Sequence, residues 1–158
     1  MILTSAPELK DAESGPAAPT SAQVAKGAPF HTLLYVEDNP ANLKLVEHLI
    51  ARRPDMRLLT AVNGNLGIEL ARSSHPRVIL MDINLPDITG FEALTILRGG
   101  HTTADIPVIA LSANAMPRDI EKGLKAGFLR YLTKPIKVNE FMDALDLALD
   151  LAKTNSVH

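Results

Sequence analysis

Five residues carry groups that could act together in one reaction, although the sequence separates them widely. They are the acids Glu37, Asp38 and Asp82, the hydroxyl of Ser112 and the ammonium group of Lys134. Phosphoryl transfer to an aspartate uses such a set, because a carboxylate can act as the nucleophile while cationic and hydroxyl groups stabilise the phosphoryl oxygens. The chemistry therefore depends on whether the fold brings these residues together.

The alternation of strand-like and helix-like segments predicts the fold that must position them. Five short apolar runs are typical of strands, and they cover residues 32–36, 56–61, 78–81, 106–111 and 128–132. Each run is followed by a segment whose apolar residues repeat at helical spacing. Five such strand and helix units predict right-handed crossovers and one parallel sheet that is covered by helices on both faces.

Capping signals predict several helix ends. Asn39 precedes a proline and predicts the start of the first helix. The stretch 89–92 reads as a capping box. A helix over residues 117–126 should end at Gly127, and the last helix should run from about 138 to 153.

Charge along the strands predicts their order. The runs 78–81 and 108–111 carry no charge, which suits strands buried on both faces. Arg57 and Arg130 suit edge strands, where a charge discourages further pairing. The expected architecture is therefore the flavodoxin-like α/β fold, a doubly wound five-stranded parallel sheet of order 2-1-3-4-5 with five helices.

This order predicts one site at the carboxyl edge of the sheet. Ligands bind where the strand order reverses, here between the first and third strands, and the five groups above follow strands that end at that edge. Carboxylates held this close repel each other, so at least one should have a raised pKa without a cation. An open cleft with few protein ligands favours Mg²⁺ over Ca²⁺. The sequence thus predicts magnesium-assisted formation of an aspartyl phosphate.

Composition limits the other function classes. The chain has 158 residues, 46% of them hydrophobic, and its net charge of −2 argues against sequence-independent binding to nucleic acid. It has no cysteine, which excludes disulfides and thiolate metal sites. No apolar run approaches the roughly 20 residues that cross a bilayer, and the first residues do not resemble an export signal. We expect a cytoplasmic protein without membrane contact.

Three parts are expected along the chain. Residues 1–29 are rich in Ala, Pro, Ser, Gly and Thr, which predicts a disordered tail or linker. Residues 30–153 hold every predicted strand and helix and form one domain. Residues 154–158 are expected to be a disordered C-terminus, too short for a DNA-binding or enzymatic output domain.

Four stretches in this order resemble the response-regulator receiver domain and are similar to the bacterial chemotaxis response regulator. They read LYVEDN at 34–39, ILMDINLP at 79–86, VIALSA at 108–113 and YLTKP at 131–135. The resemblance implies that Asp82 is the phosphoacceptor. It also implies an Mg²⁺ site formed by Asp38 directly, Glu37 through water, Asp82, and the backbone carbonyl of Asn84.

The resemblance implies roles for the later strands as well. Ser112 and Lys134 would contact the phosphoryl group, and Ser112 with Tyr131 would form the conformational switch. The peptide between Lys134 and Pro135 is expected to be cis, as in the family. Because Met116 offers no capping side chain to the next helix, we expect the loop 113–116 to be mobile until activation orders it.

The resemblance also implies the partners. The phosphodonor would be a sensor histidine kinase or a histidine phosphotransfer protein, and the signal would pass to a protein target through the fourth helix, fifth strand and fifth helix. The domain would not be an enzyme beyond catalysing its own phosphorylation and dephosphorylation. It could be free-standing or the C-terminal receiver of a hybrid sensor histidine kinase.

Three alternative functions make different demands on the sequence. A phosphatase of the haloacid dehalogenase type would carry a second Asp two residues after its nucleophile, where this chain has Asn84. A flavodoxin-like nucleotide-binding module would need a glycine-rich loop after the first strand, where Glu37 and Asp38 stand instead. A receiver that never accepts phosphate is the third, although every chemical residue is present.

Overall fold

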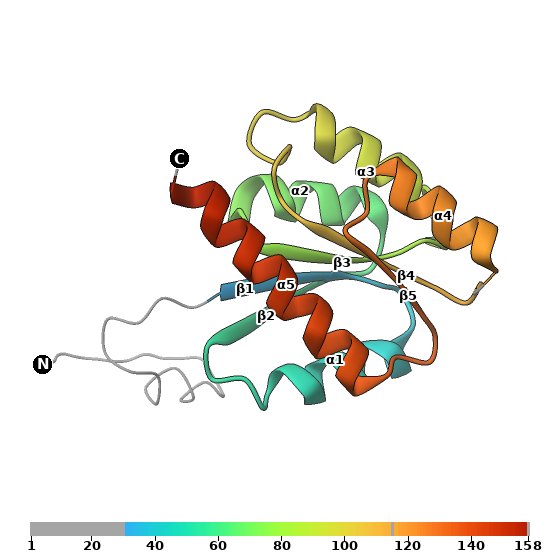
Figure 1. The fold of residues 1–158 in the computed structure, drawn as a ribbon, viewed down its shortest axis with the longest axis horizontal. Coiled ribbons are helices and arrows are strands. Elements are labelled where there is room, and N and C mark those ends of the chain that lie inside the picture. The colour runs from blue at the N-terminus through green and yellow to red at the C-terminus, as the bar shows by residue number, and fades with distance from the viewer. Residues whose placement is uncertain (1–30, 115, 158) are drawn as a thin grey trace, which may run out of the picture.

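The strands form one central sheet with helices on both faces (Figure 1). The computed structural model describes residues 31–114 and 116–157, with side-chain surroundings as far as Ala152. The strands are β1 (His31–Val36), β2 (Met56–Ala61), β3 (Val78–Asp82), β4 (Val108–Ser112) and β5 (Arg130–Thr133). All neighbouring pairs are parallel, and the order β2-β1-β3-β4-β5 confirms the prediction.

Two strands begin two residues later than predicted. β4 was expected from residue 106, but residue 107 is a proline and has no amide to give to the sheet. β5 was expected from Phe128, whose amide instead donates to the carbonyl of Gly123 and closes the preceding helix. The local bonding at each position explains the shorter strand.

The helices are α1 (Pro40–Ile50), α2 (Gly64–Ser74), α3 (Gly90–Gly99), α4 (Pro117–Ala126) and α5 (Val138–Val157). The Asn39 side chain accepts hydrogen bonds from the first amides of α1, and the capping box of Thr89 and Glu92 is present. Gly127 ends α4 with a φ of 118°, a conformation that glycine adopts without strain. These three predictions are confirmed.

The predicted end of the last helix was wrong. α5 continues to Val157, four residues beyond the predicted end at Lys153, so residues 154–157 are helical rather than disordered. No proline or glycine lies between Lys153 and Val157 to end the helix. The predicted tail at 1–29 lies outside the described residues.

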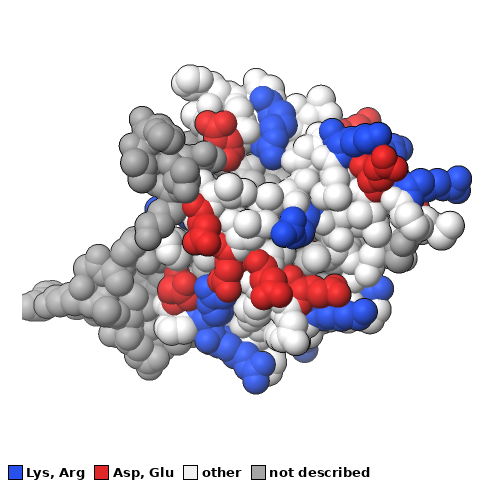
Figure 2. Space-filling model, in the orientation of Figure 1, with Lys and Arg blue, Asp and Glu red and all other residues white. Residues whose placement is uncertain are grey.

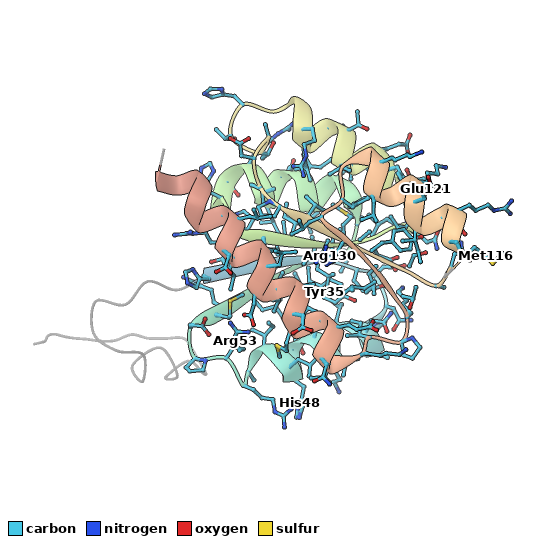
Figure 3. The ribbon with its side chains drawn as sticks, in the orientation of Figure 1. Tyr35, His48, Arg53, Met116, Glu121 and Arg130 are labelled. Atoms are coloured by element: carbon cyan, nitrogen blue, oxygen red, sulfur yellow. The ribbon has the colours of Figure 1, made fainter. Side chains whose placement is uncertain are left out.

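Alternate residues of the strands pack into two separate cores. Leu33 and Tyr35 of β1 face α1 and α5, where Phe141 and Leu145 are fully buried. Leu34 faces the opposite side with α2 and α3. The two-residue period of β1 thus fixes which side chains point toward α5, and this includes Tyr35, which Figure 3 labels beside that helix.

The surface of the molecule around α5 carries both acidic and basic side chains. Figure 2 shows acidic groups in a row along α5, which carries the exposed acids Glu140, Asp143, Asp146 and Asp150, with basic groups beside them. Arg53 joins this helix to the turn after α1, because its guanidinium lies 3.2 Å from Asp146. Within the described parts of the chain, no helix combines the length and apolarity that a membrane span requires.

Candidate functional site

The carboxyl edge of the sheet brings the two acidic strand ends together. β1 and β3 are neighbours, and Val36 lies opposite Met81 in the register. Glu37 directly follows β1 and Asp82 is the last residue of β3, so the two lie side by side at the point where the strand order reverses. The residues after β4 and β5 reach the same edge, which is where a ligand site was predicted.

Three carboxylates and one ammonium group lie together there. Carboxylate oxygens of Glu37, Asp38 and Asp82 all lie within 4.8 Å of one another. Glu37 and Asp82 are buried, whereas Asp38 is exposed. The Lys134 ammonium lies 3.1 Å from Oδ2 of Asp82 and 3.5 Å from Oε1 of Glu37. The structure thus brings these four predicted residues into one cluster that is open to solvent at Asp38.

Burial and repulsion shape the protonation of this cluster. Burial raises the pKa of Asp82 to about 6, and the neighbouring Glu37 adds to the shift, while the Lys134 ammonium opposes it. Burial would also raise the pKa of Glu37, but hydrogen bonds from Asp82 and Tyr35 lower it below its usual value. The sequence predicted one carboxyl with a raised pKa, and that carboxyl is the one of Asp82.

The donor set fits a hard divalent cation. Mg²⁺ prefers carboxylate and carbonyl oxygens and keeps several waters, and the cluster offers three carboxylates with one side open. Without a cation, burial and the neighbouring Glu37 disfavour the charged form of Asp82, and a cation held by both carboxylates would offset their repulsion. Cation binding would therefore lower the pKa of Asp82 and favour its ionised form.

Tyr35 is a part of the site that the sequence did not reveal. Its hydroxyl donates a 2.8 Å hydrogen bond to Oε1 of Glu37, and burial together with that carboxylate raises the pKa of the phenol. The backbone amide of Asn39 and the side-chain amide of Asn42 also donate to Glu37, at 3.2 and 3.3 Å. The two-residue spacing of Tyr35 and Glu37 was the available signal, because alternate strand residues share a face.

The loop after β3 folds back over Asp82. The backbone amide of Asn84 donates to Oδ1 of Asp82 at 3.0 Å. The loop closes where the amide of Gly90 donates to the carbonyl of Ile83 at 2.8 Å, and Asn84 pairs with Thr89 in an isolated bridge. The Asn84 backbone is thereby held beside Asp82, where the prediction gave its carbonyl a role as metal ligand.

Ser112 is the last residue of β4, and Tyr131 lies on the neighbouring strand β5, opposite Ala110. Ser112 is fully buried, and its Oγ accepts a hydrogen bond from the amide of Asn114 at 3.1 Å. Its carbonyl accepts from the amide of Lys134 at 2.8 Å. The ring of Tyr131 is half-buried and lies against Gly123 of α4. Their action as a switch stays a prediction.

Two local expectations around this edge are confirmed and a third stays a prediction. The peptide between Lys134 and Pro135 is cis, as expected. Met116 gives α4 no side-chain cap, also as expected. The proposed mobility of the loop 113–116 stays a prediction, and Ala115 within it lies outside the described residues.

Comparison with known proteins identifies relatives with the same organisation. The family model of the response regulator receiver domain matches residues 33–146. The polar-differentiation response regulator DivK of Brucella ovis is 38% identical over 114 residues, which cover 72% of this chain and 92% of that protein. The same name and the same identity recur in Brucella suis.

Solved structures agree with the sequence relatives. The receiver domain of the sensor histidine kinase PA1611 from Pseudomonas aeruginosa, with a magnesium ion coordinated in its active site cleft, is 33% identical, with a TM-score of 0.69. The match covers 77% of this chain and 98% of that domain. The chemotaxis response regulator CheY4 of Vibrio cholerae is 24% identical with a TM-score of 0.70, covering 76% of this chain and 99% of that one, and it shows the shared fold.

Proposed function

The chain belongs to the response regulator receiver domain family, and from this membership we propose that Asp82 is the residue that accepts the phosphoryl group. As a receiver domain it is a signalling domain of a two-component system, which interacts with a histidine kinase or a histidine phosphotransfer protein. The observation that carries the assignment is the 3.1 Å contact between the Lys134 ammonium and the buried carboxylate of Asp82.

The transfer step follows from the chemistry of the donor. A carboxylate oxygen of Asp82 attacks the phosphorus of a phosphohistidine, the bond from phosphorus to nitrogen breaks, and the imidazole takes up a proton. The product is an aspartyl phosphate. Lys134 would then contact the phosphoryl oxygens, and the hydroxyl of Ser112, at the end of the neighbouring strand, would donate to one of them.

We propose that Mg²⁺ is the cation of this site. Asp38 and Asp82 would bind it directly, Glu37 through water, and the Asn84 carbonyl would complete the protein ligands. When bound, the ion neutralises negative charge on the phosphoryl oxygens during transfer. The 33% identical receiver domain with magnesium in its cleft supports this choice of ion.

We propose that the signal leaves through α4, β5 and α5. Two large apolar side chains are exposed at this helix, Met116 just before α4 at 56% and Leu124 on α4 at 46%. Figure 3 labels Met116 and Glu121 along this helix, and a shallow hollow lies between Pro117, Glu121 and Leu124. A protein target with a complementary apolar side chain would fit there.

Two further parts of the proposal concern catalytic activity and cellular location. We propose that the domain is no enzyme toward other substrates and catalyses only its own phosphorylation and dephosphorylation. We also propose a cytoplasmic location, because the ATP that charges histidine kinases is found there. The relatives include both a response regulator and a receiver from a sensor kinase, so a free-standing receiver and a fragment of a hybrid kinase both fit.

Incubation with acetyl phosphate and Mg²⁺, followed by intact-mass measurement, tests the assignment. The wild type should gain the mass of one phosphoryl group, and Asp82→Asn should gain none. Uptake by both proteins would remove Asp82 from its role. Sustained release of phosphate from a simple phosphate ester would favour the phosphatase alternative, and no uptake by the wild type would favour a receiver that never accepts phosphate.

A further inference from the structure

Asp87, in the loop after β3, caps a helix that is distant from it in the sequence. Its Oδ1 accepts a hydrogen bond from the amide of Gly64, and its Oδ2 accepts one from the amide of Asn65, both at 2.8 Å. These are the first two amides of α2, which have no partner inside their own helix. The third, that of Leu66, donates to the side chain of Asn63 at 2.8 Å.

Electrostatics favour this contact. The N-terminus of a helix carries partial positive charge, which attracts a carboxylate. Desolvation would raise the pKa of Asp87, but hydrogen bonds from the amides of Asn65 and Gly64 lower it below its usual value. Asp87 therefore stays ionised through the neutral range, and the contact is maintained there.

Close packing fixes the same junction. A side-chain carbon built on Gly64 would lie 2.5 Å from Cγ1 of Ile88, which is closer than nonbonded carbons approach. The absence of a side chain at Gly64 thus lets the tip of the loop lie directly against α2. Two charge-assisted hydrogen bonds and this packing tie residues 87 and 88 to the helix.

The loop that Asp87 holds is the one that carries Asn84. At its base the loop is closed by the bond from Gly90 to Ile83 and by the bridge between Asn84 and Thr89. At its tip the contact of Asp87 with α2 is the second anchor. With both anchors in place, the Asn84 backbone has little freedom to move away from Asp82.

We propose that Asp87 is a positioning residue for the cation site. It ties the loop of residues 83–89 to the start of α2, and so holds the Asn84 backbone beside Asp82, where the Asn84 carbonyl would serve the proposed cation site. This inference rests on the proposed function, since it assigns Asp87 to the site at which phosphorylation takes place. Loss of the contact weakens cation binding, although Asp87 does not touch the cation.

Asn63 supplies the matched control. Asn63→Ala and Asp87→Ala both remove caps from the same end of α2, but only Asp87 also holds the loop. Both variants should lower the urea midpoint. Titration with MgCl₂ by calorimetry, in buffer without phosphate, should show about tenfold weaker binding for Asp87→Ala, as is common for residues that orient metal ligands. Asn63→Ala should bind Mg²⁺ like the wild type.

A second variant separates positioning from a loss of folding. Asp87→Asn keeps one acceptor oxygen, so its Mg²⁺ affinity should lie between those of the wild type and Asp87→Ala. Equal affinities of Asp87→Ala and Asn63→Ala would overturn the inference while leaving the proposed function intact, provided that both still take up phosphate. Absence of Mg²⁺ binding and phosphate uptake in the wild type would overturn the proposed function, and this inference with it.

Discussion

The Tyr35 hydroxyl donates a 2.8 Å hydrogen bond to Oε1 of Glu37, and both side chains are fully excluded from solvent. A buried carboxylate is costly unless donors surround it. Glu37 has donors from Tyr35, Asn39 and Asn42, with the Lys134 ammonium nearby. Glu37, which the family resemblance assigns to the metal site, is therefore stabilised as a buried carboxylate by these hydrogen-bond donors.

Tyr35→Phe should destabilise the protein. The change removes one hydroxyl, leaves a buried carboxylate short of a donor, and should cost about 1 to 3 kcal/mol of unfolding free energy. Urea denaturation at pH 7 measures this cost. Tyr131→Phe removes the same atom from a half-buried ring and should have a much smaller effect. Equal effects of the two changes would show that the bond to Glu37 contributes nothing specific.

Stability without a cation should fall as the pH rises from about 5 to about 7. The folded pKa of Asp82 is about 6, above the value of about 3.9 in an unfolded chain. Protonated Asp82 therefore favours the folded state, and this contribution, at most about 3 kcal/mol, is complete below pH 4 and is lost as the pH rises through 6.

The titration of Glu37 does not affect stability in this pH range. Its folded pKa is lowered, so its contribution to stability is present above its unfolded value and is lost only as the pH falls below about 4. Urea midpoints in chelator at pH 5, 6 and 7 should therefore decline in the wild type and stay level in Asp82→Asn. A decline of equal size in Asp82→Asn would assign the titration to another group.

Lys134→Gln should slow phosphorylation strongly. The ammonium group lies 3.1 Å from Asp82, at the position where the charge of an incoming phosphoryl group would develop. Loss of a group that stabilises such charge costs about a hundredfold in rate in other enzymes. The rate of mass gain from acetyl phosphate measures the effect. Lys137→Gln removes the same charge from an exposed position just before α5 and should leave the rate unchanged.

The sequence predicts the parts of the site that topology determines. Asp82 and Lys134 lie 52 residues apart, yet a parallel sheet must deliver the ends of its strands to one edge, so their meeting could be predicted. The bonds from Asp87 to α2 could not be predicted. They depend on the conformation of the seven-residue loop 83–89, and no periodicity in the sequence predicts that conformation.

Tyr35 was missed for a different reason. In an apolar strand an aromatic residue is most simply explained by packing, and its ring does pack in the core shared with α5. Only its hydroxyl belongs to the site. The α5 boundary was misplaced because a helix end without a glycine or proline has no strong local signal.

Gly123→Ala should destabilise the protein although alanine is the better helix former. A side-chain carbon at position 123 would overlap Cδ2 of the Tyr131 ring and would lie 2.9 Å from its Cε2. The ring must move to admit it, at a cost of about 1 to 3 kcal/mol, which exceeds the gain of about 0.5 to 1 kcal/mol from replacing glycine inside a helix. Urea denaturation should give a lower midpoint.

Gly99→Ala is the matched control, because, apart from the backbone of its own helix and its chain neighbours, no atom of the described residues lies within 4 Å of a carbon added at that position of α3. It should leave the midpoint unchanged or raise it. In the background of Tyr131→Ala the sign at position 123 should reverse, since the ring that opposes the methyl group is gone and the helix preference of alanine remains. If Gly123→Ala lowered the midpoint equally with and without the ring, the contact between α4 and Tyr131 would not be the cause. A reversal would establish that the ring of Tyr131 and the position of α4 are coupled, which is the arrangement that a switch at this residue requires.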